Sequence, residues 1–372
     1  MEKLQETRLE IDLNALRFNF QVLKSHLKPE TKIMGVVKAF AYGTDSVVIG
    51  KALQDLGVSY LAVAYIEEGI RLRKSGIDLP VLIFYPQLEE LPQLLEYKLT
   101  PSVYSFNFLR SLHQNLKTQG VKDFPIHLKI NTGMNRLGFD PPQFEEVKQS
   151  LSDRETLKLT GIFSHLAAAG MAEERDFTLD QIQRFKTAVT SFEEYAHEHL
   201  LTHLCNSSGI LNFAEAEMDM VRAGIGLYGY GNNAEEHFKL KPVVSLKTPI
   251  AQLRWIKKGE SVGYDRKYVA QESRHIATLP LGYADGISRQ YGNNNGIVKI
   301  KDQTAPIVGN VCMDTLMVDV TGIDCEVGDD VLIFGRGHSA LEFDKNSLSI
   351  PYELITRISQ RVSRIILDDQ NG

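Results

Sequence analysis

The chain has 372 residues, of which 43% are apolar and 24% are charged, and its formal net charge is −6. This composition is typical of a globular protein and excludes disordered, collagen-like and disulfide-rich chains. Because a slightly acidic chain lacks the basic surface that binds a phosphate backbone, we expect no nucleic-acid partner.

The amino-terminal stretch MEKLQETRLEIDL carries charges where a signal peptide needs an apolar run, and no later stretch is apolar enough to cross a membrane. We therefore expect a cytoplasmic protein with no membrane partner. The three cysteines, Cys205, Cys312 and Cys325, are widely spaced, which fits neither a disulfide framework nor a metal-ligand pattern. We expect no metal.

Helical patterns occur along the first two thirds of the chain. The first predicted helix follows Asp12, which is placed as its N-cap, and shows apolar residues at three- and four-residue spacing. A second helix is expected to end just before Gly76, a residue type that often follows a helix. Thr178 and Gln181 have the spacing of a capping box and predict the start of another helix.

Eight short, almost continuously apolar runs lie between these helical stretches. In chain order they are GVVKA, LAVAY, VLIFY, PSVY, IHLKI, GIFSH, LTHLC and VRAGIGLYG. Continuous apolar runs indicate strands that are buried on both faces, as in a parallel sheet. Eight strand–helix units over roughly 230 residues match a closed barrel better than an open sheet.

Beyond about residue 240 the pattern changes to β-branched runs separated by Gly, Asn and Asp clusters, which indicates an all-β domain. The polar stretch GNNAEEHFKLKP marks a boundary. We therefore predict an α/β protein in which an N-terminal (β/α)8 TIM-like barrel, residues 8–238, precedes a C-terminal all-β domain, residues 239–372. Residues 1–7 are expected to associate with the second domain.

Polar side chains follow the predicted barrel strands, at the end of the barrel where active sites of this fold lie. They are Lys38, Lys129, Arg136, His165, Asn206, Ser207 and Arg222. The excess of basic groups favours an anionic, phosphate-bearing ligand, and a glycine-rich run after Arg222 would let backbone amides approach a phosphate. A buried lysine has a lowered pKa, which suits Schiff-base chemistry and points to pyridoxal 5′-phosphate.

Each of these residues also has an ordinary structural interpretation. A lysine at the end of a strand often extends into solvent, and a buried histidine is often simply hydrogen-bonded. Arg136 and Arg222 are equally suited to surface ion pairs, and Tyr264 to a cross-strand aromatic contact. It is the coincidence of several such groups at one end of successive strands that supports the functional interpretation.

Several motifs resemble those of the alanine racemase family, in the same order and spacing from about Asp12 to Arg364. They are VVKAFAYG, KINTGMNRLGF, NSSG, RAGIGLYG, GESVGYDRKY, LGYADGISR, GNVCMDTLMVDV and PYELITRISQRVSR. The resemblance implies an isomerase that interconverts L- and D-alanine through an aldimine with pyridoxal 5′-phosphate and supplies D-alanine for peptidoglycan synthesis. It also implies a homodimer with active sites at the interface.

The resemblance assigns roles to individual residues. Lys38 would hold the cofactor and act as the base on one face of the substrate, and Tyr264, from the other subunit, would act on the opposite face. The implied cofactor contacts are Lys38, Tyr42, Arg136, His165, Asn206, Ser207, Arg222, Gly224, Ile225 and Tyr352. The implied substrate contacts are Arg136, Tyr283, Met313 and Asp314. Lys129 matches a lysine that is often carbamylated.

Some positions depart from the family's common motif. Phe40 stands where an asparagine is usual, and Thr44 and Asp45 replace a His-Gly pair. These changes leave open whether the substrate is alanine, serine or lysine, because a methyl-sized difference in a pocket is worth only about 1–3 kcal/mol. Two other classes stay open: a pyridoxal phosphate decarboxylase of similar architecture, and a non-catalytic cofactor carrier consisting of a barrel alone.

Overall fold

The computed structural model describes residues 6–152, 155–196, 198–344, 346 and 348–369. Within this part of the chain there are two compact units. The barrel unit contains residues 17–41 and 46–240, and the β unit contains residues up to 16, residues 42–45 and residues from 241 onward. The domain boundary expected near residue 238 stays a prediction, and most of the 1–7 segment lies outside the described residues.

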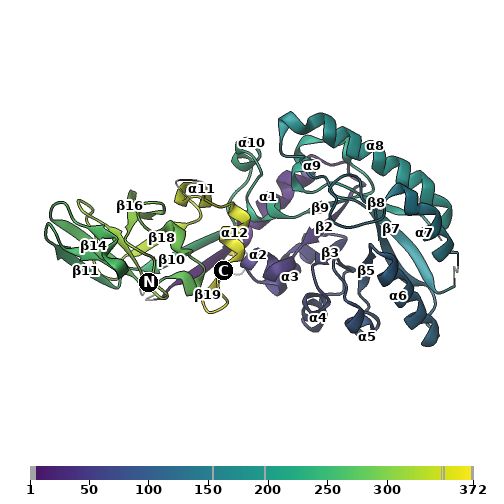
Figure 1. Cartoon of the computed structure of the whole chain (residues 1–372), viewed down its shortest axis with the longest axis horizontal. Coiled ribbons are helices and arrows are strands. Elements are labelled where there is room, and N and C mark those ends of the chain that lie inside the picture. The colour runs from purple at the N-terminus through teal and green to yellow at the C-terminus, as the bar shows by residue number, and fades with distance from the viewer. Residues whose placement is uncertain (1–5, 153–154, 197, 345, 347, 370–372) are drawn as a thin grey trace. The chain divides into compact units, whose positions relative to one another are not determined.

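The barrel unit is built on eight parallel strands that close on themselves (Figure 1). The strands are β2 (Lys32–Val36), β3 (Tyr60–Val63), β4 (Val81–Ile83), β5 (Thr100–Val103), β6 (Phe124–Lys129), β7 (Leu157–Phe163), β8 (Leu201–His203) and β9 (Met220–Ala223). The last strand pairs with the first, with Met220 opposite Lys32, which closes the ring. All eight apolar runs therefore contribute a strand, and the predicted (β/α)8 TIM-like barrel is confirmed.

Helices follow the barrel strands. They are α2 (Lys38–Gly43), α3 (Ser46–Asp55), α4 (Ile66–Lys74), α5 (Leu91–Glu96), α6 (Phe106–Thr118), α7 (Phe144–Ser150), α8 (Arg175–Phe192), α9 (Ser207–Asn212) and α10 (Ala234–Phe238), and α1 (Leu13–Ser25) precedes β2. None of the helices formed by the described residues has both the length and the hydropathy that a membrane-spanning segment needs.

Two of the three predicted helix ends are confirmed. Asp12 Oδ1 accepts hydrogen bonds from the amides of Asn14 and Ala15 and so caps α1. Gly76 has φ +83° just beyond α4, a conformation that glycine adopts without strain. The capping box at Thr178 and Gln181 is wrong, because α8 begins at Arg175 and both residues lie inside it.

The β unit contains a nine-stranded sheet in the order β11-β14-β17-β16-β15-β18-β10-β1-β19 and a two-stranded sheet, β12-β13. The strands are β1 (Arg8–Asp12), β10 (Val244–Pro249), β11 (Gln252–Ile256), β12 (Ser261–Val262), β13 (Tyr268–Val269), β14 (Arg274–Leu279), β15 (Ile297–Ile300), β16 (Gln303–Val308), β17 (Leu316–Asp319), β18 (Asp330–Phe334) and β19 (Ser363–Leu367). The unit also has two short helices, α11 (Ala340–Phe343) and α12 (Pro351–Thr356). The predicted C-terminal domain is confirmed as β-rich, and it contains these two short helices besides its strands.

Strand β1, which was not predicted from the sequence, lies between β10 and β19 in the large sheet. Leu9 and Ile11 are buried on this strand, but so is Arg8, whose guanidinium donates to both carboxylate oxygens of Asp330 at 2.9 and 2.7 Å. Thr7, just before the strand, hydrogen-bonds Thr248 and the carbonyl of Pro280. Because Arg8 is a charged residue at a buried position, this strand of the β unit is difficult to predict from its local sequence.

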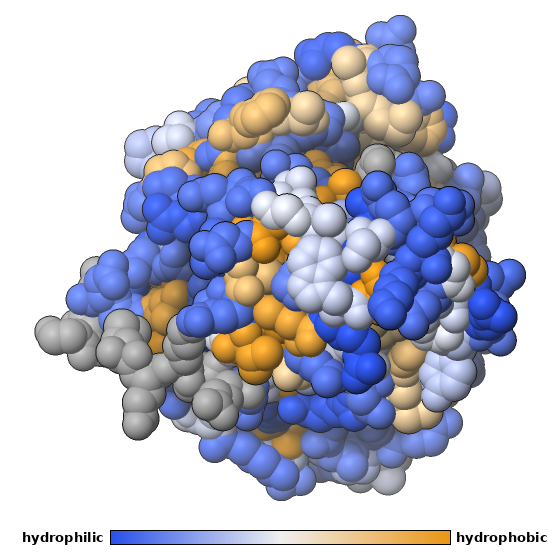
Figure 2. All heavy atoms as spheres, turned by 90° about the vertical axis from the view of Figure 1, so that its left-hand side faces the viewer, coloured by the Kyte–Doolittle hydropathy of each residue, from blue (hydrophilic) through white to orange (hydrophobic). Residues whose placement is uncertain are grey.

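Large apolar and aromatic side chains remain exposed on the β unit. Figure 2 looks onto the end of this unit that carries β11 and β14, where apolar patches lie between hydrophilic side chains. The exposed fraction is 63% for Trp255, 70% for Tyr264 and 54% for Met313. Exposed apolar patches often mark a surface that binds another molecule.

Candidate active site

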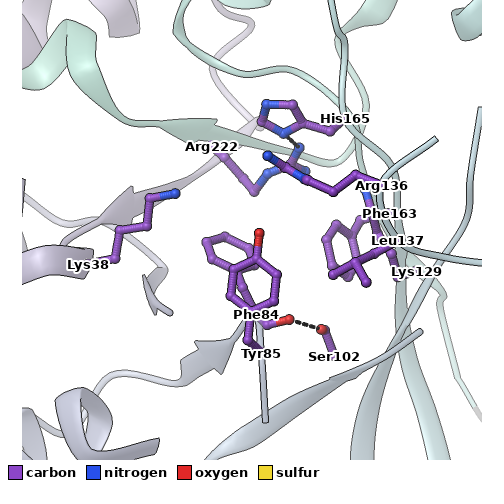
Figure 3. Close-up of a pocket in the computed structure, with 10 residues that line it drawn as sticks. All are labelled: Lys38, Phe84, Tyr85, Ser102, Lys129, Arg136, Leu137, Phe163, His165 and Arg222. Atoms are coloured by element: carbon purple, nitrogen blue, oxygen red, sulfur yellow. Dashed lines mark hydrogen bonds between the residues drawn. The ribbon is translucent and has the colours of Figure 1, made fainter. Parts of the chain in front are cut away.

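A cavity of about 460 Å³ lies in the barrel unit, at the carboxyl ends of the strands (Figure 3). Its lining is formed by Lys38, Phe84, Tyr85, Ser102, Lys129, Arg136, Leu137, Phe163, His165 and Arg222. Five of these residues are lysine, arginine or histidine, and none is an aspartate or glutamate. The cavity is therefore suited to an anionic ligand. Five residues singled out from the sequence are brought together here.

Arg222, on β9, is buried among neutral acceptors. Its Nη1 donates to Nδ1 of His203 at 2.9 Å, and its Nη2 donates to Nδ1 of His165 at 3.1 Å and to the carbonyl of Ser164 at 2.6 Å. Burial lowers the pKa of Arg222 to about 10, so the guanidinium is still charged at neutral pH. These neutral partners fix the position of the Arg222 guanidinium but do not compensate its positive charge.

His165 follows β7 and is held from two sides. Burial, and next the charge of Arg222, lower the pKa of His165 well below its usual value, so the ring is neutral at neutral pH. Because Nδ1 accepts from Arg222, the ring proton is on Nε2. The backbone carbonyl of His165 accepts from Nε2 of Gln181, whose Oε1 accepts from the amide of Ala167. Gln181 is thus a support for this loop, which explains its burial in the middle of α8.

Lys38 is the first residue of α2, and its amine points into the cavity, as does the hydroxyl of Tyr85 (Figure 3). Burial lowers the pKa of Lys38, the charge of Arg136 lowers it further, and Glu68 opposes this effect. A lowered pKa increases the fraction of neutral amine, which is the form that attacks a carbonyl group. The structure thus gives Lys38 the environment that Schiff-base chemistry requires.

Lys129 ends β6, and its Nζ lies 4.7 Å from the centre of the Phe163 ring. Burial lowers the pKa of Lys129 well below its usual value, and the charges of Arg222 and Arg136 lower it further. A lowered pKa increases the fraction of Lys129 that carries a neutral amine.

A second cluster lies where α9 follows β8. Asn206 caps α9 by accepting from the amide of Gly209 at 2.9 Å, and Ser207 is the first residue of the helix. The Ser207 hydroxyl oxygen accepts from the amides of Gly224 and Gly226 at 3.0 and 3.1 Å. Since a hydroxyl has two acceptor positions and one proton, both acceptor positions are filled and the proton is left to donate to a further acceptor.

Ile225, which was also singled out from the sequence, lies between these two glycines and is buried. A methyl group at residue 226 would lie only 3.1 Å from Cβ of Ser207, so the close approach of the two segments favours glycine there. Asn206, Ser207, Gly224 and Ile225 are therefore brought together in the barrel unit, as a cluster of backbone amides around one buried hydroxyl.

The remaining residues singled out from the sequence belong to the β unit, and none of them is in the lining of the barrel cavity. The rings of Tyr42 and Tyr352 lie 6.2 Å apart, and burial raises the pKa of Tyr42. Tyr264 lies in a turn whose backbone carbonyl accepts from Nδ2 of Asn310.

Tyr283, Met313 and Asp314 lie on two loops that are joined by backbone hydrogen bonds. The amide of Tyr283 donates to the carbonyl of Cys312 at 2.9 Å, and the amide of Ala284 donates to that of Met313 at 3.0 Å. Arg361 donates to Asp314 at 2.7 Å and to Asp285 at 2.7 Å, which holds the loops to a third segment. These residues form a shared exposed surface on the β unit.

Several functional neighbours were missed by the sequence analysis. Tyr85 and Ser102 line the cavity. Tyr85 ends the third apolar run, so the strand-end argument that selected Lys38 applies equally to it, whereas Ser102 lies inside the fourth run. Gln181 and His203 act on cavity residues from elsewhere in the chain, and their hydrogen-bonding partners leave no pattern in the local sequence.

The chain is similar to alanine racemases along nearly its whole length. The sequence model described as "Alanine racemase, N-terminal domain" matches residues 11–232, and that described as "Alanine racemase, C-terminal domain" matches residues 243–366. A curated relative, alanine racemase 2 of Caldanaerobacter subterraneus subsp. tengcongensis, is 36% identical over 375 residues, which cover 98% of this chain and 96% of the relative.

Solved structures show the same similarity. The alanine racemase of Clostridium difficile 630 superposes with a TM-score of 0.91 at 35% identity, covering 98% of this chain and 97% of that one. The structure of its complex with cycloserine gives a TM-score of 0.89 at 34% identity, with coverage of 98% and 96%.

Proposed function

Because the chain belongs to the alanine racemase family, we propose that it is an enzyme that interconverts L- and D-alanine with pyridoxal 5′-phosphate as its cofactor. The observation that carries this proposal is the barrel cavity, in which Arg136, Lys129, His165 and Arg222 surround the amine of Lys38 and no carboxylate is present in the lining. A decarboxylase with a carboxylate at the cofactor's ring nitrogen does not fit such a lining.

The residues of this chain fit the cofactor. The free proton of the Ser207 hydroxyl and the glycine amides beside it suit a phosphate group, and the amine of Lys38 suits an aldehyde. We propose that the residues assigned by the family resemblance hold it: Lys38, Tyr42, Arg136, His165, Asn206, Ser207, Arg222, Gly224, Ile225 and Tyr352. When bound, pyridoxal 5′-phosphate supplies an electron sink for the negative charge that develops at Cα of an amino acid.

Lys38 and Tyr264 are proposed to move the proton. Inversion at Cα needs a proton to be removed from one face and returned on the other, so two groups on opposite faces are required. The lowered pKa of Lys38 makes its amine a better match to a base that works near neutral pH. Arg222 stays protonated because its pKa, about 10, is above that range, and it keeps a positive charge beside the neutral ring of His165.

Arg136, Met313, Asp314 and Tyr283 are proposed to bind the substrate. A guanidinium binds a carboxylate with two parallel hydrogen bonds, which suits Arg136 to the carboxylate of an amino acid. We also propose that Lys129 is carbamylated, because its depressed pKa favours the neutral amine that reacts with carbon dioxide. The resulting negative group would compensate part of the charge of Arg136.

The departures from the family motif do not argue against alanine as substrate. Phe40 is 43% exposed and carries the guanidinium of Arg71 over its ring at 5.4 Å, and Thr44 and Asp45 belong to the β unit. None of the three lines the barrel cavity. Alanine is therefore the preferred substrate over serine and lysine in this proposal. Supply of D-alanine to peptidoglycan synthesis follows from it, and a cytoplasmic location stays a prediction from the sequence.

A homodimer with shared active sites is part of the proposal. Tyr264 is 70% exposed, Met313 54% and Tyr283 43%, and all three lie on the β unit. Exposure of this kind supports contact with a second copy of the chain, which would bring Tyr264 to the cavity of its partner.

Chiral chromatography tests the proposed reaction. The protein with added pyridoxal 5′-phosphate is incubated separately with L-alanine, L-serine and L-lysine, and a Lys38→Ala variant is the control. We expect D-alanine to form fastest and the variant to form none. Faster inversion of serine or lysine would contradict the substrate, and formation of an amine with release of carbon dioxide would contradict the reaction.

A further inference from the structure

The residues that follow Lys38 adopt a left-handed conformation. The φ angles of Ala39, Phe40, Ala41 and Tyr42 are +53°, +54°, +52° and +55°. A left-handed helical turn is unfavourable for residues with a side chain, because Cβ comes too close to the next carbonyl oxygen. Such a run persists only where the surrounding structure fixes it, and strained backbone of this kind clusters at functional sites.

The backbone is fixed on both sides of Lys38 by the neighbouring strand and helix. The amide of Val37 donates to the carbonyl of Ala62, the third residue of β3, at 2.9 Å. The amide of Ala39 donates to Oε1 of Glu68 at 2.5 Å. Glu68 lies in the first turn of α4, directly after β3, so both anchors belong to the same strand–helix unit of the barrel.

The other oxygen of the Glu68 carboxylate caps the helix to which Glu68 belongs. Oε2 accepts from the amides of Ala64 and Tyr65 at 2.7 and 3.1 Å, which caps the start of α4. Capping needs only this one oxygen. The contact of Oε1 with Ala39 is therefore an addition that capping does not explain, and it ties the start of the left-handed turn to the end of β3.

We propose that Glu68 is a positioning residue for Lys38, because its carboxylate fixes the amide next to Lys38 and so directs the Lys38 amine into the cavity. The inference deepens the proposed function and rests on it for the role of Lys38. Nothing in the local sequence of Lys38 indicates this partner, which is 29 residues away.

The test compares Glu68→Gln with Glu67→Gln in the enzyme loaded with pyridoxal 5′-phosphate. The glutamine at residue 68 is isosteric but replaces one acceptor oxygen with an NH2 group, which cannot accept from a backbone amide. Glu67 is an exposed carboxylate on the same turn of α4 and serves as the matched control. Two quantities are measured: the steady-state constants for alanine, and hydrogen exchange of the peptide that contains Ala39, by mass spectrometry.

We expect Glu68→Gln to lower kcat about tenfold with KM within about twofold, because the reacting amine loses its alignment while the substrate contacts remain. Exchange of the Ala39 peptide should become faster in this variant, and Glu67→Gln should change neither quantity. If Glu68→Gln does not fold, Glu68→Asp replaces it, with the same direction of change expected, since its shorter side chain cannot reach both segments.

Unchanged exchange in Glu68→Gln and also in Glu68→Ala, which has neither acceptor oxygen, would overturn the inference with or without a loss of rate, because the contact with Ala39 would not be what Glu68 provides. Faster exchange with an unchanged kcat would also overturn it. Should the parent enzyme not act on alanine at all, the proposed function fails, and the exchange result together with borohydride trapping of the cofactor on Lys38 decides the role of Glu68: unchanged trapping in Glu68→Gln rejects it.

Discussion

Single residues of the site divide into those that the sequence predicted and those that it did not. Lys38 and Arg222 were found because they end or occupy buried apolar runs, where a charged side chain is rare. Glu68 and Gln181 were not found, because each acts on a backbone group of a different segment and so has no local pattern. Burial and charge can be inferred from neighbours in sequence, whereas a partner from another strand–helix unit cannot.

The first prediction concerns the Ser207 hydroxyl and the affinity for the cofactor. Replacing Ser207 with alanine removes the group proposed to donate to the phosphate, and a hydrogen bond to a charged group contributes about 1.5–3 kcal/mol. The dissociation constant of pyridoxal 5′-phosphate should therefore rise roughly 10- to 100-fold, measured by titration of the absorbance of the bound cofactor.

Ser208→Ala is the control for this prediction. The Ser208 hydroxyl is also buried, but it donates to Glu236 and accepts from Asn232, so its loss disturbs the same helix without removing the proposed phosphate contact. Equal weakening of cofactor binding in the two variants would show that the effect of Ser207 is a general loosening of α9.

At the scale of elements, the continuous apolar runs predicted all eight barrel strands, because burial on both faces leaves a strong signal. Strand β1 was missed although its alternation of charged and apolar residues is typical of a strand. Its buried Arg8 is compensated by Asp330, 322 residues away, a partner that the local sequence does not indicate. The capping box in α8 failed for a related reason: Gln181 faces the interior and hydrogen-bonds His165 and Ala167 in the loop after β7 and Thr132 in the loop after β6. Local spacing identifies an element more reliably than its ends.

Two barrel strands carry buried histidines that lead to a prediction about pH. Arg222 donates to Nδ1 of His203, so His203 donates through Nε2 to Nδ1 of His127 at 3.0 Å. Among the described residues, Nε2 of His127 has no partner. Burial lowers the pKa of His127 from its usual 6.5 to about 3, and lowers that of His203 and His165 as well.

These neutral histidines should make the free energy of unfolding depend on pH. Below pH 6.5 the unfolded chain binds protons that the folded chain does not, so stability is fully present above that pH and is lost as the pH falls toward the folded pKa. The slope for one such histidine is about 1.4 kcal/mol per pH unit. The free energy of unfolding of the cofactor-free protein is measured by urea titration at several pH values between 6.5 and 5. The slope of this free energy against pH should be smaller by about this amount in His127→Gln than in the parent protein. An identical slope in the two proteins would show that His127 is protonated in the fold.

For the whole molecule, the apolar and β-branched runs predicted the fold class and the resemblance of the motifs indicated the family. The strand topology confirms the fold class, and the family models confirm the family over most of the chain. The motifs do not indicate which surfaces of two subunits contact one another. The exposed Tyr264, Tyr283 and Met313 support a dimer in which each β unit completes the site of the other subunit.

Mixed subunits test this arrangement. Lys38→Ala and Tyr264→Phe chains are each expected to be inactive, and a mixed dimer of the two keeps one site with both groups intact. Random reassortment makes half of the dimers mixed, so about a quarter of the parent activity should return. No recovery, with mixed dimers detected by native mass spectrometry, would indicate that Tyr264 acts within its own chain.

In the proposed reaction, two groups exchange the Cα proton of alanine on opposite faces. The most direct measurement is proton NMR of L-alanine incubated with the enzyme and pyridoxal 5′-phosphate in D₂O, with chiral analysis of the product. We predict that the Cα proton signal disappears while D-alanine accumulates, and that Tyr264→Phe retains exchange of the Cα proton of L- or D-alanine but forms little of the opposite enantiomer. Absence of Cα exchange in the parent enzyme would contradict the account.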